Sequence, residues 1–106
     1  MAITVETHPK DLVRVATSQA SGTAVIHELD PRLEYVAEAT VTSAGTATMM
    51  VTATDMDVVT PAFANMSAAY DGTQSANFAR VMKGIRYVGL NVASGAFTLT
   101  VRRVAV

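Results

Sequence analysis

Cysteine and tryptophan are both absent from this chain of 106 residues, and charged residues make up only 16% of it. Without cysteine the chain has no disulfide framework, no thiolate nucleophile and no cysteine-based zinc site. An average soluble domain has about 25% charged residues, and here the formal net charge is −1. This balance gives no bulk electrostatic reason to bind nucleic acid or an acidic membrane.

Long apolar runs are missing as well. The uninterrupted apolar stretches are only a few residues long, whereas a membrane-spanning helix needs about 20. Glu6 and His8 occupy the region where a signal peptide would need an apolar core, so we do not expect secretion by that route. The length suits one domain. We expect an N-terminal arm or edge strand over residues 1–10 and a main domain over residues 11–106.

Small and β-branched residues dominate what is present. The chain has 18 Ala, 15 Val and 14 Thr, but only eight Leu and Ile together. Such residues pack well on a pleated surface and are poorly suited to a leucine-based helical bundle. The composition therefore favours an all-β domain.

Apolar side chains alternate with polar ones in several segments, which is the period of a half-buried strand. The alternation begins at Leu33, resumes after residue 45 and recurs from Val88. It predicts an antiparallel β-sandwich, similar to a jelly roll, with about seven or eight strands and at most one short helix. The predicted core positions are Tyr35, Ala37, Met49, Val51, Val88, Leu90, Phe97 and Leu99.

Serine and glycine occur together at three corners between these segments. The corners are Ser21-Gly22, Ser43-Ala44-Gly45 and Ser94-Gly95. Glycine supplies the positive φ that short hairpin loops require, and serine helps to close the turn. We therefore predict a strand, a tight turn and a strand at the second and third corners.

Further strands are predicted at Leu12–Thr17, Thr23–Leu29 and Phe78–Lys83. Thr60–Gly72 does not alternate and has two interpretations. Thr60 could cap a helix of at most two turns, with Pro61 at its first position. The alternative is a strand at Met56–Thr60 followed by a long irregular loop.

Residues with catalytic or metal-binding chemistry do not form a convincing group. His8 and His27 are the only histidines, and nothing at ligand spacing accompanies either. Asp55 and Asp57 could hold a calcium ion at a loop, but a solvated strand end explains them more simply. The chain has no nucleophile elbow, dinucleotide fingerprint or phosphate-binding loop. We expect no enzyme activity, no cofactor and no metal.

Partner contacts are the alternative use of the surface. The candidates are Ile3, Val5, Arg80, Lys83, Arg86, Arg102 and Arg103. The five basic residues could meet an acidic surface of another subunit, or they could pair with Glu28, Glu34 or Glu38 of the same chain. The two apolar residues could cover a sheet edge of a neighbour, or they could form an edge strand of their own sandwich.

The segment Gly84-Ile85-Arg86-Tyr87-Val88-Gly89-Leu90-Asn91-Val92-Ala93-Ser94-Gly95-Ala96-Phe97-Thr98-Leu99-Thr100-Val101 resembles the closing hairpin of small β-sandwich virion proteins of tailed bacteriophages. Those proteins commonly end in a "G-x-R-Y-V-R-V-x-V-x-S-G-x-x-T-V-T" pattern. Tyr35–Asp55 resembles the strand pair that precedes it. Gly89 departs from the pattern, which has a second arginine there.

This resemblance implies a structural component of a virion, assembled in the host cytoplasm. The expected role is a head-decoration (cement) protein, homo-oligomeric in the particle, that binds the major capsid protein or a tail protein. A tail or head–tail junction module and a carbohydrate-binding module are the alternatives. The resemblance implies no nucleic-acid or membrane partner.

Overall fold

The computed structural model describes residues 2–7, 14–57, 59–69 and 72–104, and 67% of these described residues are in strands. The all-β prediction is confirmed. The described strands are β1 (Ala2–Thr7), β2 (Arg14–Ala20), β3 (Thr23–Glu28), β4 (Glu34–Thr52), β5 (Ser67–Ala68), β6 (Phe78–Lys83) and β7 (Tyr87–Arg103). A single 3-10 turn at Phe63–Asn65, η1, is the helical element of the described chain.

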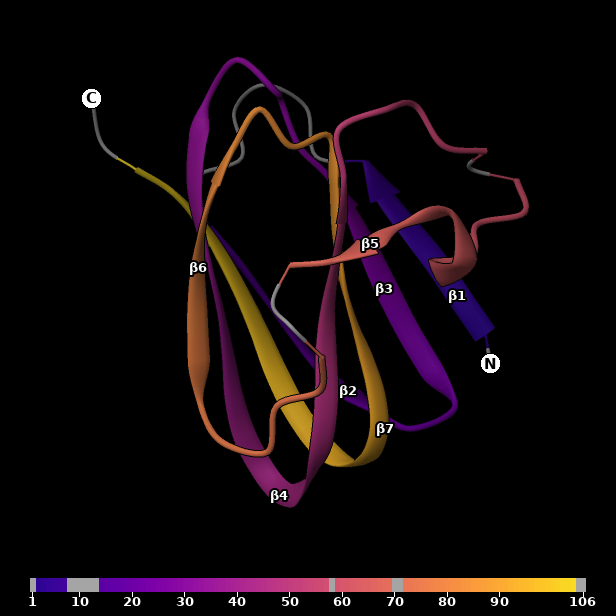
Figure 1. Ribbon diagram of the computed structural model, residues 1–106, viewed down its shortest axis with the longest axis vertical. Helices are drawn as coiled ribbons and strands as arrows, with labels where there is room; N and C mark the ends of the chain where they lie inside the picture. The colour runs from indigo at the N-terminus through magenta and orange to yellow at the C-terminus, as the bar shows by residue number, and fades with distance from the viewer. Residues whose placement is uncertain (1, 8–13, 58, 70–71, 105–106) are drawn as a thin grey trace.

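The strands form one mixed sheet curled into a half-barrel. β4 and β7 have 19 and 17 residues, pair along most of their lengths and bend back together at one end (Figure 1). Each therefore contributes to two facing layers. The first layer contains β2, the second half of β7, the first half of β4, and β6. The second layer contains β1, β3, the first half of β7, the second half of β4, and β5.

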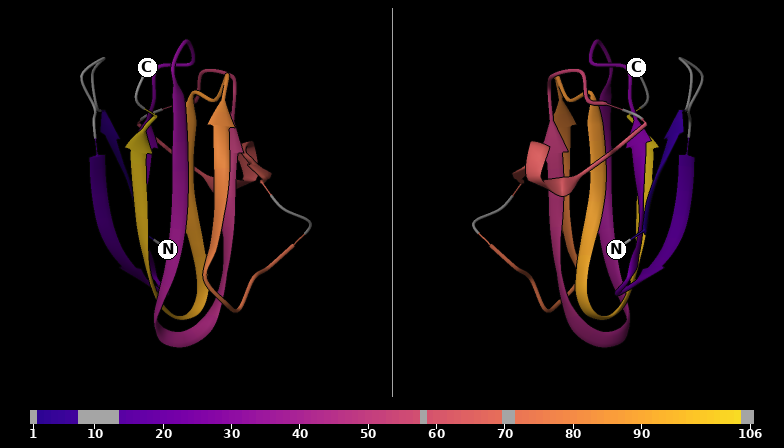
Figure 2. Two further views of the ribbon diagram at one scale, coloured as in Figure 1. Left: turned by 90° about the vertical axis from the view of Figure 1, so that its left-hand side faces the viewer. Right: turned by 90° about the vertical axis from the view of Figure 1, so that its right-hand side faces the viewer.

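Figure 2 shows the first layer toward the viewer on the left and the second layer toward the viewer on the right, each with the other layer behind it, as in a sandwich. The layers are arms of one sheet and not two separate sheets, because β4 and β7 run continuously from one into the other. The sheet is also not wholly antiparallel, since β1 runs parallel to β3.

The bend coincides with two of the predicted corners, and it corrects the hairpin prediction. Ser43 pairs with Ala96 and Thr46 pairs with Ser94, with register shifts on both sides. Gly45 and Gly95 meet there so closely that a side chain on either would collide with the backbone of the other strand. The chain does change direction at each corner, but the two halves of each strand then lie in opposite layers and do not pair with each other as in a hairpin. Only Ser21-Gly22 joins consecutive strands, β2 and β3.

The main core lies between the two layers. Seven of the eight predicted core residues are at most 1% exposed, namely Tyr35, Ala37, Met49, Val88, Leu90, Phe97 and Leu99. The eighth, Val51, is half-buried and packs against them. The alternating pattern thus identified the inward face of both long strands.

A second apolar cluster covers the outer side of the second layer. Its buried members are Ile26, Met56, Met66 and Tyr87, with Ile3, Val5, Met50 and Phe63 packed against them. The connection from β4 to β5 crosses this side and carries η1 over Gly89. A Cβ at Gly89 would lie 2.9 Å from Ile26 Cγ1 and 3.1 Å from Phe63 Cε1. The small residue at position 89 therefore lets the connection lie close to the sheet.

The same connection differs from both interpretations of Thr60–Gly72, because the N-cap of its helical turn is Ala62 and not Thr60. Helix formation is limited to η1, and the described residues of Met56–Thr60 form no strand. Met56 and Met66 anchor the segment through burial and not through backbone pairing. Residues 58, 70 and 71 lie outside the described residues.

The N-terminal segment forms the edge strand that we gave as one of its two alternatives. Ile3 lies opposite Ala24 and Val5 opposite Ile26 in β3. Pairing with β3 satisfies one side of the β1 backbone, and both side chains are half-buried in the second cluster. His8 and residues 9–13 lie outside the described residues. Within the described chain, no helix is long and apolar enough to span a membrane.

Candidate interaction surface

The five basic candidates do not form one patch. Arg102 and Lys83 lie on the outer face of the first layer, opposite Val36 and Glu34 respectively. Arg103 lies opposite buried Tyr35 and is therefore on the core-facing side of β7. Neighbouring residues of a strand point to opposite faces. Arg102 and Arg103 are adjacent in sequence, but their side chains consequently project from opposite faces of β7.

Arg86 belongs to a cluster of charged and polar groups within the chain. Its Nη2 lies 3.5 Å from Glu28 Oε2, and its Nε lies 3.6 Å from Asp55 Oδ1. The Tyr87 hydroxyl donates to the same Glu28 oxygen at 2.9 Å. These contacts tie the end of β3, the start of β7 and the start of the covering connection together.

The same cluster raises the pKa of two side chains, Arg86 and Tyr87. The hydrogen bond with Tyr87 and the charge of Glu28 raise the pKa of Arg86, although its burial opposes this. Burial, followed by the hydrogen bond to Glu28, raises the pKa of the Tyr87 hydroxyl. Both groups keep their protons at neutral pH, so the cluster works as a structural clamp.

Arg102 also has a partner within the chain. Its Nε lies 3.8 Å from Glu38 Oε1, and both side chains are about half exposed, at 49% and 46%. An exposed pair of this kind contributes about 0–1 kcal/mol. Intramolecular pairing therefore accounts for Arg86 and Arg102 among the predicted contact residues.

The histidine and aspartate candidates have structural roles. His27 is fully buried, with Nε2 3.2 Å from Thr17 Oγ1 and Nδ1 3.7 Å from Glu6 Oε2. It links β1, β2 and β3. The Asp57 carboxylate accepts hydrogen bonds from the Thr60 hydroxyl and from two backbone amides, which lower its pKa. No group of three or more potential metal ligands occurs among the described residues.

The outer face of the first layer is the broadest uncovered region. We call it the open face and define it by Arg14, Ala16, Ser18, Val36, Glu38, Thr40, Ala79, Val81, Lys83, Thr98, Thr100 and Arg102. All of these residues are exposed or half-exposed. No described segment crosses in front of its strands (Figure 2). Six of these twelve residues are small or carry a hydroxyl group, four are charged and two are valines.

β6 forms one edge of this face. Among the described residues it pairs with β4 alone, so its other edge has backbone groups free to pair. Val81 projects from it and is 59% exposed. The only other exposed large hydrophobic residue of the described chain is Val59, in the connection between β4 and β5. β6 is thus the described strand with the clearest features of an interaction edge.

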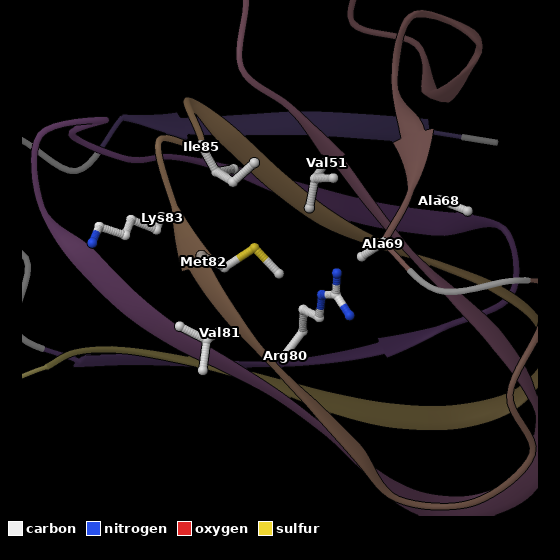
Figure 3. A pocket seen from close by; sticks show the side chains of 8 residues that line it. All are labelled: Val51, Ala68, Ala69, Arg80, Val81, Met82, Lys83 and Ile85. Atoms are coloured by element: carbon white, nitrogen blue, oxygen red, sulfur yellow. The ribbon is translucent and has the colours of Figure 1, made fainter.

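A hollow of about 260 Å³ lies between β6 and β5, on the inner side of this edge. Arg80 and Met82 point into it from β6, and Val51 and Ile85 line its opposite side (Figure 3). Lys83 and Val81 point away from it. Ligand pockets usually occupy about 300–1,000 Å³ and are well enclosed. The hollow is smaller than this and open, so it continues the β6 edge without forming a separate site.

No family of proteins, no curated protein and no solved structure matches this chain. The resemblance to phage virion proteins therefore depends on the residues quoted for it alone.

Proposed function

We propose that this protein is a structural component that acts by binding other protein surfaces. The observation that carries the proposal is the difference between the outer sides of the two layers. The outer side of the second layer is covered by the chain's own connection from β4 to β5, whereas the open face and the β6 edge are uncovered in the described chain. An uncovered sheet face of mixed small, hydroxyl-bearing and charged residues beside an exposed edge strand suits assembly better than it suits catalysis in a cleft.

The resemblance of Gly84–Val101 makes the proposal more specific. On that basis the component belongs to the virion of a tailed bacteriophage, as a head-decoration or cement protein bound to the major capsid protein. Such proteins act in many copies, so contacts that are weak individually become strong together. In this role the open face would rest on the capsid or on neighbouring copies.

A tail or head–tail junction module is the second candidate, because the resemblance does not distinguish positions in the particle. A carbohydrate-binding module is the third, because of the hydroxyl-rich open face. Sugar sites usually add an exposed aromatic ring. The described aromatic residues are buried or half-buried, namely Tyr35, Phe63, Phe78, Tyr87 and Phe97. This burial favours a protein partner over a sugar.

The test is to purify tailed particles induced from the organism that encodes this chain, separate heads from tails, and search both by mass spectrometry. Many copies in the head fraction would support a decoration protein, and enrichment in tails would support the second candidate. Absence from particles would overturn the virion assignment. Reproducible binding of the purified protein to one class of sugar on a glycan array would overturn it in favour of the third candidate.

A further inference from the structure

β6 has two properties that together indicate a strand-pairing edge. It is paired on one side only within the described chain, and it presents Val81, which is 59% exposed. An apolar side chain beside free N–H and C=O groups is a template for another strand. We propose that β6 pairs antiparallel with β6 of a second copy of this chain, centred on Val81. The two first layers would then form one continuous sheet.

The alternation of β6 restricts how two copies can align. Ala79, Val81 and Lys83 point outward, whereas Phe78, Arg80 and Met82 lie on the side of β4 that carries Tyr35, Ala37 and Ala39. Directly opposed residues of an antiparallel pair share a face. A two-fold pair must therefore oppose one central residue to itself. A long overlap is obtained only when the centre is Arg80, which pairs 78–82, or Val81, which pairs 79–83.

Charge selects between these two registers. Centring the pair on Arg80 would place two guanidinium groups directly opposite each other, which is destabilising. Centring it on Val81 buries the exposed valine against its own copy. Lys83 then lies opposite Ala79 of the second copy, beside which Glu38 stands in β4. The small Ala79 leaves room for the Lys83 ammonium to approach that carboxylate.

Lysine and inward-pointing charges on an edge strand commonly protect it from aggregation. Here Lys83 is compatible with the register centred on Val81, and Arg80 disfavours the register centred on itself. A single two-fold register limits pairing to a closed dimer. The contact is small, because a standard interface buries about 800 Å² on each partner. We therefore expect a weak dimer that dissociates on dilution. The inference concerns the isolated chain, so it goes beyond the virion assignment and does not depend on it.

Cross-linking tests the pairing directly, because the chain has no cysteine of its own. Residues opposed in an antiparallel pair have Cα atoms about 4.5–5.5 Å apart, within the range of about 4.4–6.8 Å for a disulfide. We expect Val81→Cys to form a covalent dimer under mild oxidation. Val59→Cys is the matched control, because Val59 is more exposed, at 84%, but lies in a connection. Arg80→Cys reports the competing register.

The proposal requires Val81→Cys to cross-link at least about tenfold faster than both other variants, since only its sulfur atoms would be held within bonding range. Equal rates for Val81→Cys and Val59→Cys would show random collision and overturn the proposal. Faster cross-linking of Arg80→Cys would overturn the register. Val81→Lys should abolish concentration-dependent sedimentation without lowering the melting temperature. Unchanged association of that variant would also contradict the proposal.

Discussion

The two layers of this protein share the long strands β4 and β7, but their outer sides differ in whether another segment of the chain covers them. In the second layer, Ile26, Gly89 and Met50 lie beneath the connection from β4 to β5, and Tyr87 is held by the clamp with Glu28 and Arg86. In the first layer, the corresponding outer positions are small, hydroxyl-bearing or charged, apart from Val36 and Val81, and remain uncovered in the described chain. One half of the outer surface of the curled sheet is thus covered by the chain's own connection, and the other half is available to a partner.

The largest effect should come from the bend that separates the layers. Gly45→Val should prevent folding or cost about 4 kcal/mol or more, because a side chain there collides with the Ser94 backbone of β7. Gly22→Ala is the control. Gly22 has a positive φ, of 92°, but an added Cβ meets nothing within 4 Å, so we expect a cost of only about 1–2 kcal/mol. Urea unfolding checks both values, and similar costs would show that the bend needs no close approach.

The core shared by the layers comes next. Leu90 is fully buried between them, and Leu90→Ala should lower the free energy of unfolding by about 2–5 kcal/mol. Thermal and urea unfolding measure the loss. A change below about 1 kcal/mol would mean that the two layers do not pack on each other at this position.

The covering of the second layer should contribute less than the core. Phe63→Ala removes the ring that lies over Gly89 and Ile26. Because Phe63 is only half-buried, we expect a loss of about 1–3 kcal/mol, below the range for a fully buried phenylalanine. The variant should also bind a hydrophobic dye more strongly, as the uncovered cluster becomes accessible. No change in either measurement would show that the connection does not protect this side.

The clamp at Tyr87 adds a smaller, pH-dependent contribution. The pKa of the Tyr87 hydroxyl is higher in the folded protein than the ordinary value of 10.0, so the folded state holds this proton more tightly than the unfolded state. The associated stability is present below about pH 10 and is lost as pH rises through the folded pKa. Tyr87→Phe should therefore flatten the alkaline decline in melting temperature. An unchanged alkaline profile in Tyr87→Phe would refute the assignment.

The smallest effect should come from the open face. Thr100 lies in the middle of it and faces away from the core. Thr100→Lys, which would lie opposite Glu38 of β4, should change the free energy of unfolding by less than about 0.5 kcal/mol, although its long side chain should impair binding of a partner through this face. A large loss of stability would indicate that the open face is covered within the folded chain.

The alternation of side chains predicted the strands and most of the core because it reports a local property, which face of a strand is buried. It could not show where the arms of β4 and β7 pair. A hairpin turn and a sharp bend both use serine and glycine, and only the long-range pairing of Ser43 with Ala96 distinguishes them. The continuous run Tyr87-Val88-Gly89-Leu90 is typical of a strand buried on both faces. It was the sequence signal that could have indicated the second apolar cluster, to which Tyr87 belongs.

The interaction surface was harder to predict. Grouping the basic residues by sequence failed because strand register places Arg80 toward the hollow, Arg86 in the clamp and Arg102 on the open face. Val81 could have been singled out, since it is the apolar residue on the opposite face of β6 from Phe78 and Met82. That β6 is an edge strand depends on the fold as a whole and has no local signal.

The most direct test of an interaction edge at β6 is amide hydrogen exchange measured at low and high protein concentration. The account predicts that amides within Phe78–Lys83 become more protected as concentration rises, whereas those of β1, which is also paired on one side only among the described strands, do not change. Exchange that is independent of concentration along β6, or protection that appears at β1 instead, would contradict it.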